Sequence, residues 1–282
     1  EFGPLDEDGY WRPNNITVRE WGGNTVQQGQ TSYGWLLWFE NQSVDLAPPT
    51  TSLDGVTGSA VKVGDEWVVT VTAPAFDEQD DITGYAELLH YSSGQKIREY
   101  GEHDLVGNRM IWRFTVRSYH ASNEWTFRTF RLTDQSGNQE IYDLEDGPGA
   151  LTFDVVSVQP DLDPPELDTD ACSASAEPAN PAAPNGETFV ELHYRWRDNI
   201  AGLGSVSFRL LKPSGDTLFD YHYHDSFYAP YFAGDVTQWH DETIFVHLPV
   251  GSEPGAWGWM EMTLCDKAGN CQEHSFTELG IV

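Results

Sequence analysis

The sequence is poor in basic residues. Its 282 residues hold 15 lysines and arginines against 45 aspartates and glutamates, which gives a formal net charge of −30 at pH 7. The few cations form no basic stripe, and nucleic-acid binding needs clustered cations that neutralise phosphates. We therefore expect neither a nucleic acid nor an anionic membrane surface as a partner. The acidic surplus fits a well-solvated surface, or a chain that works in salty or calcium-rich surroundings.

Long apolar runs, helical periodicity and catalytic signatures are also missing. No run of 18 apolar residues occurs, so we expect no transmembrane helix. No sustained 3.6-residue hydrophobic period is present. The chain has no Gly-x-Ser-x-Gly elbow, no phosphate-binding loop and no His-Glu-x-x-His helix. These absences favour a protein that is not an enzyme.

The sequence is rich in aromatic residues and in glycine and proline, which favour turns. The chain holds 11 Trp, 12 Tyr and 14 Phe, together with 26 Gly and 16 Pro. This is too aromatic for a disordered chain, and so many turn residues suit a chain of many short strands. The length favours about two domains, each large enough to bury its own core.

Three segments share one spacing of key residues. Each begins with Trp, has an acidic residue nine positions later and ends in Gly-Asn thirteen positions after the Trp. The segments are residues 11–24, 125–138 and 257–270. The pattern predicts a strand whose Trp lies in a core, followed by a hairpin turn in which Asp accepts backbone hydrogen bonds and Gly tolerates positive φ.

A second shared motif suggests module boundaries. Asp-Leu-Ala-Pro-Pro begins at Asp45, and Asp-Leu-Asp-Pro-Pro begins at Asp161. Pro-Pro stiffens an extended connection and cannot join a central ladder. We therefore expect modules over residues 45–160 and 161–282, in which residues 80–84 resemble residues 198–202. Residues 1–44 would be the C-terminal part of a preceding module or a strand-donating segment.

The second module resembles a bacterial extracellular repeat of the immunoglobulin-like or fibronectin-like type. It reads Asp-Asn-Ile-Ala-Gly-Leu from Asp198, Ser-Glu-Pro-Gly-Ala-Trp up to Trp257 and Asp-Lys-Ala-Gly-Asn from Asp266. The resemblance is good over residues 161–282, fair over 45–160, and limited to the Trp and Gly-Asn anchors before that. It implies an all-β fold of tandem antiparallel β-sandwich modules, as in surface proteins and adhesins, and implies no single activity.

The three cysteines allow one short disulfide. Cys265 and Cys271 flank the turn at residues 266–270, and cysteines that face each other across a hairpin can meet the short Cα separation a disulfide needs. We expect this pair, which would point to an oxidising compartment. The alternative joins Cys172 to one of the other two.

Acidic clusters give the case for a cofactor. They are found in residues 77–81 and in the linker that begins at Asp161. Calcium takes six to eight oxygens from such loops and would stiffen the module junctions. The predicted ligands are Asp77, Asp80, Asp81, Asp161 and Asp163. Alternatively, these residues are solvated loop acids.

A dense aromatic stretch gives the case for a ligand. An exposed platform of rings could stack on sugars, while the alternative is that the rings fill the core. The candidate residues are Tyr221, Tyr223, Tyr228, Tyr231 and Trp239.

The sequence thus predicts a structural or adhesive module array of a secreted or cell-surface bacterial protein, as part of an extracellular filament or layer. Its partners would be neighbouring modules, copies of the same protein or surface glycans. The runner-up is a carbohydrate-binding accessory region of a secreted enzyme.

Overall fold

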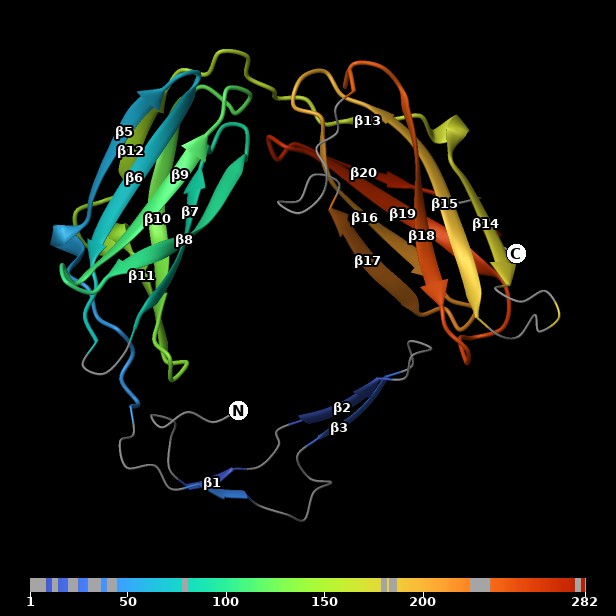
Figure 1. Cartoon of the computed structure of the whole chain (residues 1–282), viewed down its shortest axis with the longest axis horizontal. Helices are drawn as coiled ribbons and strands as arrows, with labels where there is room; N and C mark the ends of the chain where they lie inside the picture. Colours follow the sequence, from blue (N-terminus) through green and yellow to red (C-terminus); the bar gives the residue numbers. More distant parts are fainter. Residues whose placement is uncertain are drawn as a thin grey trace. The chain divides into compact units, whose positions relative to one another are not determined.

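The computed structural model describes residues 9–11, 15–19, 25–29, 37–39, 45–77, 81–178, 182, 187–223, 234–276 and 280–281. In these ranges the chain is all-β, every strand pairing is antiparallel, and the only helical elements are single 3-10 turns. None of these ranges holds a helix with the length and apolar character to cross a membrane. The chain divides into two compact units between Pro160 and Asp161 (Figure 1).

Unit 1 is one sheet that folds over itself in two layers. Its strand order is β11-β10-β7-β8-β9-β6-β5, and β12 pairs with the first part of β10. Strand β8 pairs with β7 through its first six residues and with β9 through its last three, so it leads from one layer into the other. The strands are β5 (Thr57–Val63), β6 (Glu66–Pro74), β7 (Thr83–Leu89), β8 (Lys96–Asp104), β9 (Arg109–Val116), β10 (Asn123–Thr133), β11 (Gln139–Asp143) and β12 (Leu151–Val155).

Alternating side chains build the core of unit 1. In β6, Val69, Val71 and Ala73 are buried while the residues between them are partly exposed, as the two-residue period of a strand requires. At the centre, the ring of Trp112 lies 5.7 Å from that of Phe127, measured between centroids. Burying side chains of this size contributes about 1.5–3 kcal/mol each, so this aromatic centre holds the two layers together.

Unit 2 consists of two sheets around a separate core. In one sheet β15 lies between β14 and β18 and also pairs with β13, and the other has the order β17-β16-β19-β20 with β21 beside β19. The core includes Trp196, Phe208 and Trp259. The strands are β13 (Glu166–Leu167), β14 (Ser173–Pro178), β15 (Thr188–Arg197), β16 (Leu203–Leu211), β17 (Thr217–Tyr223), β18 (His240–Leu248), β19 (Trp257–Asp266), β20 (Cys271–Ser275) and β21 (Gly280–Ile281).

The two units share most of their strand pairings, although β8 joins β9 in unit 1 whereas β17 and β18 lie in separate sheets of unit 2. Strand β6 lies between β5 and β9, and β15 lies between β14 and β18. Strand β10 pairs with β7, β11 and β12, and β19 pairs with β16, β20 and β21. Corresponding elements therefore follow each other in the same order in both units.

The tryptophans of two of the three matching segments have matching surroundings. Trp125 is fully buried and its indole Nε1–H donates to the carbonyl of Ala121, 3.0 Å away. Trp257 is 7% exposed and its indole donates to the carbonyl of Glu253, 3.1 Å away. In both cases the acceptor lies four residues before the Trp. The prediction of a core tryptophan is confirmed at these two positions.

The described strands before residue 45 pair as the last strands of a unit do. Strand β1 (Gly9–Trp11) pairs with β4 (Leu37–Phe39), and β2 (Asn15–Arg19) pairs with β3 (Thr25–Gly29). Trp11 faces Leu37, just as Trp125 faces Phe153 and Trp257 faces Ile281. Each of the three hairpins also leaves five residues between its last paired positions. The side chain of Trp11 is not among the features that the structure describes.

Candidate metal centre

Strand register brings three aspartates together in each unit. In unit 2, Glu166 lies five residues after Asp161 and pairs with Arg197, and the next residue is Asp198. In unit 1, Thr50 lies five residues after Asp45 and bridges Phe76, and the next residue is Asp77. The same register therefore places the first aspartate of each unit, Asp45 or Asp161, beside an aspartate that follows a core strand.

The third member comes from the hairpin after the tryptophan strand. In unit 2, one carboxylate oxygen each of Asp161, Asp198 and Asp266 lies within 4.8 Å of the other two. These three residues are 0%, 3% and 4% exposed. Three carboxylates from segments far apart in the sequence thus meet in the interior of unit 2.

Backbone amides orient the first two carboxylates. Asp161 Oδ2 accepts from the amide of Ala201 at 2.8 Å, and its Oδ1 accepts from Asp163 at 3.2 Å. Asp198 Oδ2 accepts from the amides of Ile200 and Gly202. Gly202 has φ +78°, a left-handed conformation that favours glycine. The tight turn after β15 therefore holds both carboxylates in place.

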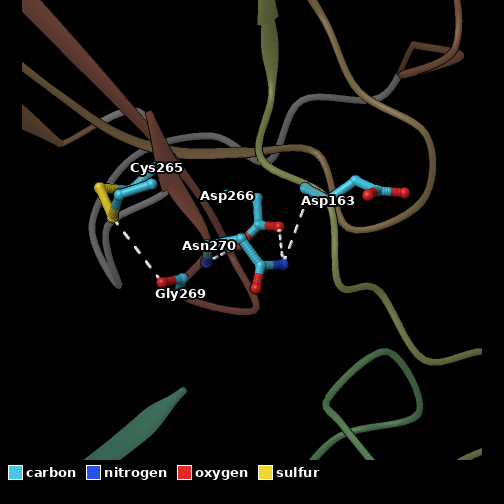
Figure 2. Close-up of a disulfide and its surroundings, with 6 residues drawn as sticks. Asp163, Cys265, Asp266, Gly269 and Asn270 are labelled. Carbon is cyan, nitrogen blue, oxygen red and sulfur yellow. Dashed lines mark hydrogen bonds between the residues drawn. A yellow bond between two sulfur atoms is a disulfide. The ribbon is translucent and has the colours of Figure 1, made fainter. Parts of the chain in front are cut away.

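Asn270 ties the third carboxylate to the entering segment. Its backbone amide donates to Asp266 Oδ1 at 2.8 Å, and its side-chain Nδ2 donates to Asp266 Oδ2 at 2.6 Å. The same Nδ2 also contacts the carbonyl oxygen of Asp161 at 3.2 Å. It contacts the carbonyl oxygen of Asp163 at 3.5 Å (Figure 2). The hairpin of β19 and β20 is thereby bound to the start of unit 2.

The unit 2 cluster is electrostatically costly by itself. Burial raises the pKa of Asp266 to about 7, and the carboxylates of Asp161 and Asp198 add to that rise. Burial also raises the pKa of Asp161, again with a contribution from Asp198. Asp198 Oδ1 is buried and has no hydrogen-bond partner within the part of the chain that the structure describes. Buried carboxylates that lie this close together are stable only when they are protonated or paired with a cation.

Unit 1 contains a similar cluster of Asp45, Asp77 and Asp134, again with oxygens within 4.8 Å of one another. Asn138 Nδ2 donates to Asp134 Oδ2 at 2.9 Å and to the carbonyl of Asp45 at 3.1 Å, which repeats the contacts of Asn270. Asp45 Oδ1 accepts from the amide of Ala47, two residues on. Its Oδ2 is buried and unpartnered among the described residues. Asp77 differs from its counterpart because it is only half-buried.

The donor chemistry of both clusters is oxygen only. Their members are aspartates, with no histidine or cysteine among the described residues of either group. Carboxylate oxygens suit hard cations such as Ca²⁺ and Mg²⁺, whereas zinc sites favour nitrogen and sulfur. The clusters can therefore hold a hard divalent cation.

The predicted calcium ligands fall into three groups. Asp77 and Asp161 lie in the two clusters. Asp81 is exposed, with its carboxylate 3.8 Å from the ring of His103, and Asp80 lies outside the described residues. The Asp163 carboxylate accepts from Asn199 Nδ2 at 3.0 Å and points away from Asp266 in Figure 2.

Four further aspartates complete the two clusters and are not among the calcium ligands that the sequence predicts. They are Asp45, Asp134, Asp198 and Asp266. A signal was present for Asp45, Asp134 and Asp266, because each lies at a matching place in a motif that both modules contain. Asp198 matches Asp80 in the sequence motif, whereas the strand register places Asp77 at the corresponding position. Local acid density pointed instead to neighbouring exposed residues.

A disulfide joins Cys265 and Cys271, with a Cα separation of 4.1 Å, as the sequence predicted. The two cysteines are the last paired positions of β19 and β20, directly beside Asp266 and Asn270 (Figure 2). Cys172 is a free, buried thiol. The disulfide therefore closes the turn that presents the third carboxylate.

Only part of the aromatic set can be placed. Tyr221 and Tyr223 lie on β17, but their side chains are outside the described features, as are Tyr228 and Tyr231 entirely. Trp239 is half-buried, and the guanidinium carbons of Arg197 and Arg195 lie 4.6 and 5.8 Å from its ring centroid. The ring of Trp239 is thus engaged by two cations.

Comparisons with known proteins add little to this geometry. No protein-family model matches the chain, and no curated protein matches it. Among solved structures, dimeric latent PorU from Porphyromonas gingivalis is similar, with 10% sequence identity and a TM-score of 0.19. The match covers 95% of this chain and 23% of the PorU chain. At that TM-score the similarity carries no argument about fold or function.

Proposed function

We propose that the chain is a structural spacer of a secreted or cell-surface bacterial protein, built from tandem immunoglobulin-like β-sandwich modules. Its work would be mechanical: to hold neighbouring domains or copies of the protein apart in an extracellular filament, layer or adhesin. Spacers of this kind need modules that fold by themselves and resist extension.

The observation that carries the proposal is the shared construction of the two units. In each, an asparagine side chain after the hairpin, Asn138 or Asn270, holds the carbonyl of the aspartate that begins the unit. Each unit also has its own hydrophobic core. Two separately closed units along one chain suit a spacer.

The disulfide supports the extracellular part of the proposal. Cys265–Cys271 is a short disulfide at a partly exposed turn. Disulfides persist in oxidising compartments and are rare in reducing ones. A secreted location therefore fits the chemistry of this hairpin.

The carbohydrate-binding alternative receives no support from the described residues. A sugar platform needs exposed ring faces, and Trp239 is half-buried beneath the guanidinium groups of Arg197 and Arg195. A glycan array is the direct test of that alternative, and a specific hit lost in Trp239→Ala would move the assignment from spacer to sugar binder.

Single-molecule stretching of the full chain tests the spacer. We expect two separate unfolding events under force, each lengthening the chain by roughly 400 Å, since ~115 residues extend by at most about 3.6 Å each. In unit 2 the disulfide withholds the few residues between its cysteines from this extension. A single event that releases both units together, or extension without measurable force, would contradict the proposal.

A further inference from the structure

We propose that Asp161, Asp198 and Asp266 bind one Ca²⁺ ion in unit 2, and that Asp45, Asp77 and Asp134 bind a second Ca²⁺ ion more weakly in unit 1. The inference stands on the geometry of the clusters and does not depend on the spacer role.

Buried charge is the first argument for a cation. The three carboxylates of unit 2 are at most 4% exposed, and their oxygens lie within 4.8 Å of one another. When all three are ionised, the negative charges at this separation repel strongly and lack hydration. A divalent cation between them offsets both costs, whereas solvated loop acids would be exposed.

Unpartnered oxygens are the second, independent argument. Asp198 Oδ1 in unit 2 and Asp45 Oδ2 in unit 1 are buried without a hydrogen-bond partner in the described structure. The side chains of these two residues are held by backbone amides through their other oxygens. In each unit one carboxylate is thus fixed with a lone oxygen left for a ligand, and leaving such an oxygen unsatisfied is costly.

The donor set favours calcium over other common metals. Three carboxylates can supply several oxygens, since each binds through one or both of its oxygens, and Ca²⁺ accepts six to eight in flexible geometry. Mg²⁺ demands near-ideal octahedral geometry and usually keeps several waters. Ca²⁺ therefore fits a cluster whose ligands come from three separate chain segments better than Mg²⁺ does.

The two sites should differ in affinity. Asp198 is 3% exposed and held by a tight turn, whereas Asp77 is half-buried. Charges in the drier site attract an ion more strongly, and a preorganised carboxylate loses less entropy on binding. Unit 2 should therefore hold calcium more tightly than unit 1.

A bound ion would fasten three parts of unit 2 that are distant in sequence. Asp161 begins the unit, Asp198 follows β15 and Asp266 ends β19. Asn270 already connects the first and last of these. The ion would also bind the turn after β15, through Asp198. It would therefore make it harder to pull the first residues of unit 2, which begin at Asp161, away from the two sheets.

Isothermal titration of the chelator-treated full chain with CaCl₂ tests the assignment. We expect two binding sites of unequal affinity. Asp198→Asn should lower the calcium affinity of the tighter site by about 100-fold or more and leave the affinity of the weaker site unchanged. Asp77→Asn should lower the affinity of the weaker site and leave that of the tighter site unchanged. The matched controls are Asp163→Asn and Asp81→Asn, which change exposed carboxylates outside the clusters and should leave both sites intact.

A second measurement guards against variants that fail to fold. The wild-type melting midpoint should fall when EDTA replaces CaCl₂, because an ion that binds only the folded state stabilises it. In EDTA, the melting midpoint of Asp198→Asn should not lie below that of the wild type, because the substitution replaces a buried charge by an isosteric amide. No binding heat together with an unchanged wild-type midpoint would overturn the proposal, as would loss of binding in Asp163→Asn. In either case the two unfolding events under force could still occur, so the spacer role is tested separately.

Discussion

Unit 1 and unit 2 share most of their strand pairings but differ in how deeply they bury the corresponding aspartates. Asp161, Asp198 and Asp266 are all buried, whereas in unit 1 only Asp45 and Asp134 are. In unit 2 the carboxylate follows β15 directly and β16 begins five residues later. In unit 1, Asp77 lies three residues beyond β6, and eight residues separate that strand from β7. The comparison teaches that the aspartate positions belong to the shared scaffold, while loop length sets their burial.

The β10–β11 hairpin of unit 1 and the β19–β20 hairpin of unit 2 also differ in how firmly they are closed. Cys265 faces Cys271 at the end of the unit 2 hairpin, and the corresponding pair in unit 1 is Thr133 and Gln139. The turn between them has the same asparagine contacts in both units. Unit 2 therefore adds a covalent closure to a turn that unit 1 holds by hydrogen bonds alone.

The largest effect is expected from substitutions that disrupt the core of one unit at a time. Trp125→Ala and Trp257→Ala should each destabilise their own unit by about 3–5 kcal/mol, because each removes a buried indole and leaves a cavity. Urea unfolding of the full chain, followed by tryptophan fluorescence, should show one transition moved and the other kept. Equal movement of both transitions would mean that the units do not unfold independently.

The disulfide gives a smaller effect, and it can be transferred. Replacing both Cys265 and Cys271 by Ser should cost unit 2 about 2 kcal/mol, the chain-entropy value for so short a loop. The double variant Thr133→Cys, Gln139→Cys should form a disulfide and stabilise unit 1 by a similar amount. Thiol titration and urea midpoints check both, and failure of the new cysteines to pair would show that the hairpins are not equivalent.

The smallest effect distinguishes the two asparagines. Asn270 is 9% exposed and its Nδ2 contacts three acceptors, whereas Asn138 is half-buried and its Nδ2 contacts two. Each truncation to Ala leaves acceptors unpaired, and this costs more in the drier site. We expect Asn270→Ala to cost about 1 kcal/mol more than Asn138→Ala. If urea unfolding gave the same loss of unfolding free energy for both variants, the two asparagines would not differ in their contribution to stability.

The all-β fold and the turn chemistry could be predicted because they depend on neighbouring residues. The alternation in β6 and the hairpin at Asp134–Asn138 are visible within a few positions of the sequence. The buried tryptophans near the start of β10 and at the start of β19 also follow from a fixed spacing in the sequence. These features need no knowledge of how distant segments pair.

The metal clusters could be predicted only in part, for the opposite reason. Asp161, Asp198 and Asp266 meet through strand register across about a hundred residues, which local acid density does not encode. Density favoured Asp81 and Asp163, which the structure leaves exposed. Alignment of the two modules offered a better guide, because Asp45 matches Asp161 and Asp134 matches Asp266.

The most direct test of the calcium assignment is a crystal structure of the full chain grown with CaCl₂, with anomalous scattering measured for the metal. We expect an anomalous peak between Asp161, Asp198 and Asp266, with carboxylate oxygens at about 2.3–2.6 Å from it. A well-ordered cluster with no anomalous peak, its carboxylates hydrogen-bonded to one another or to water, would contradict it.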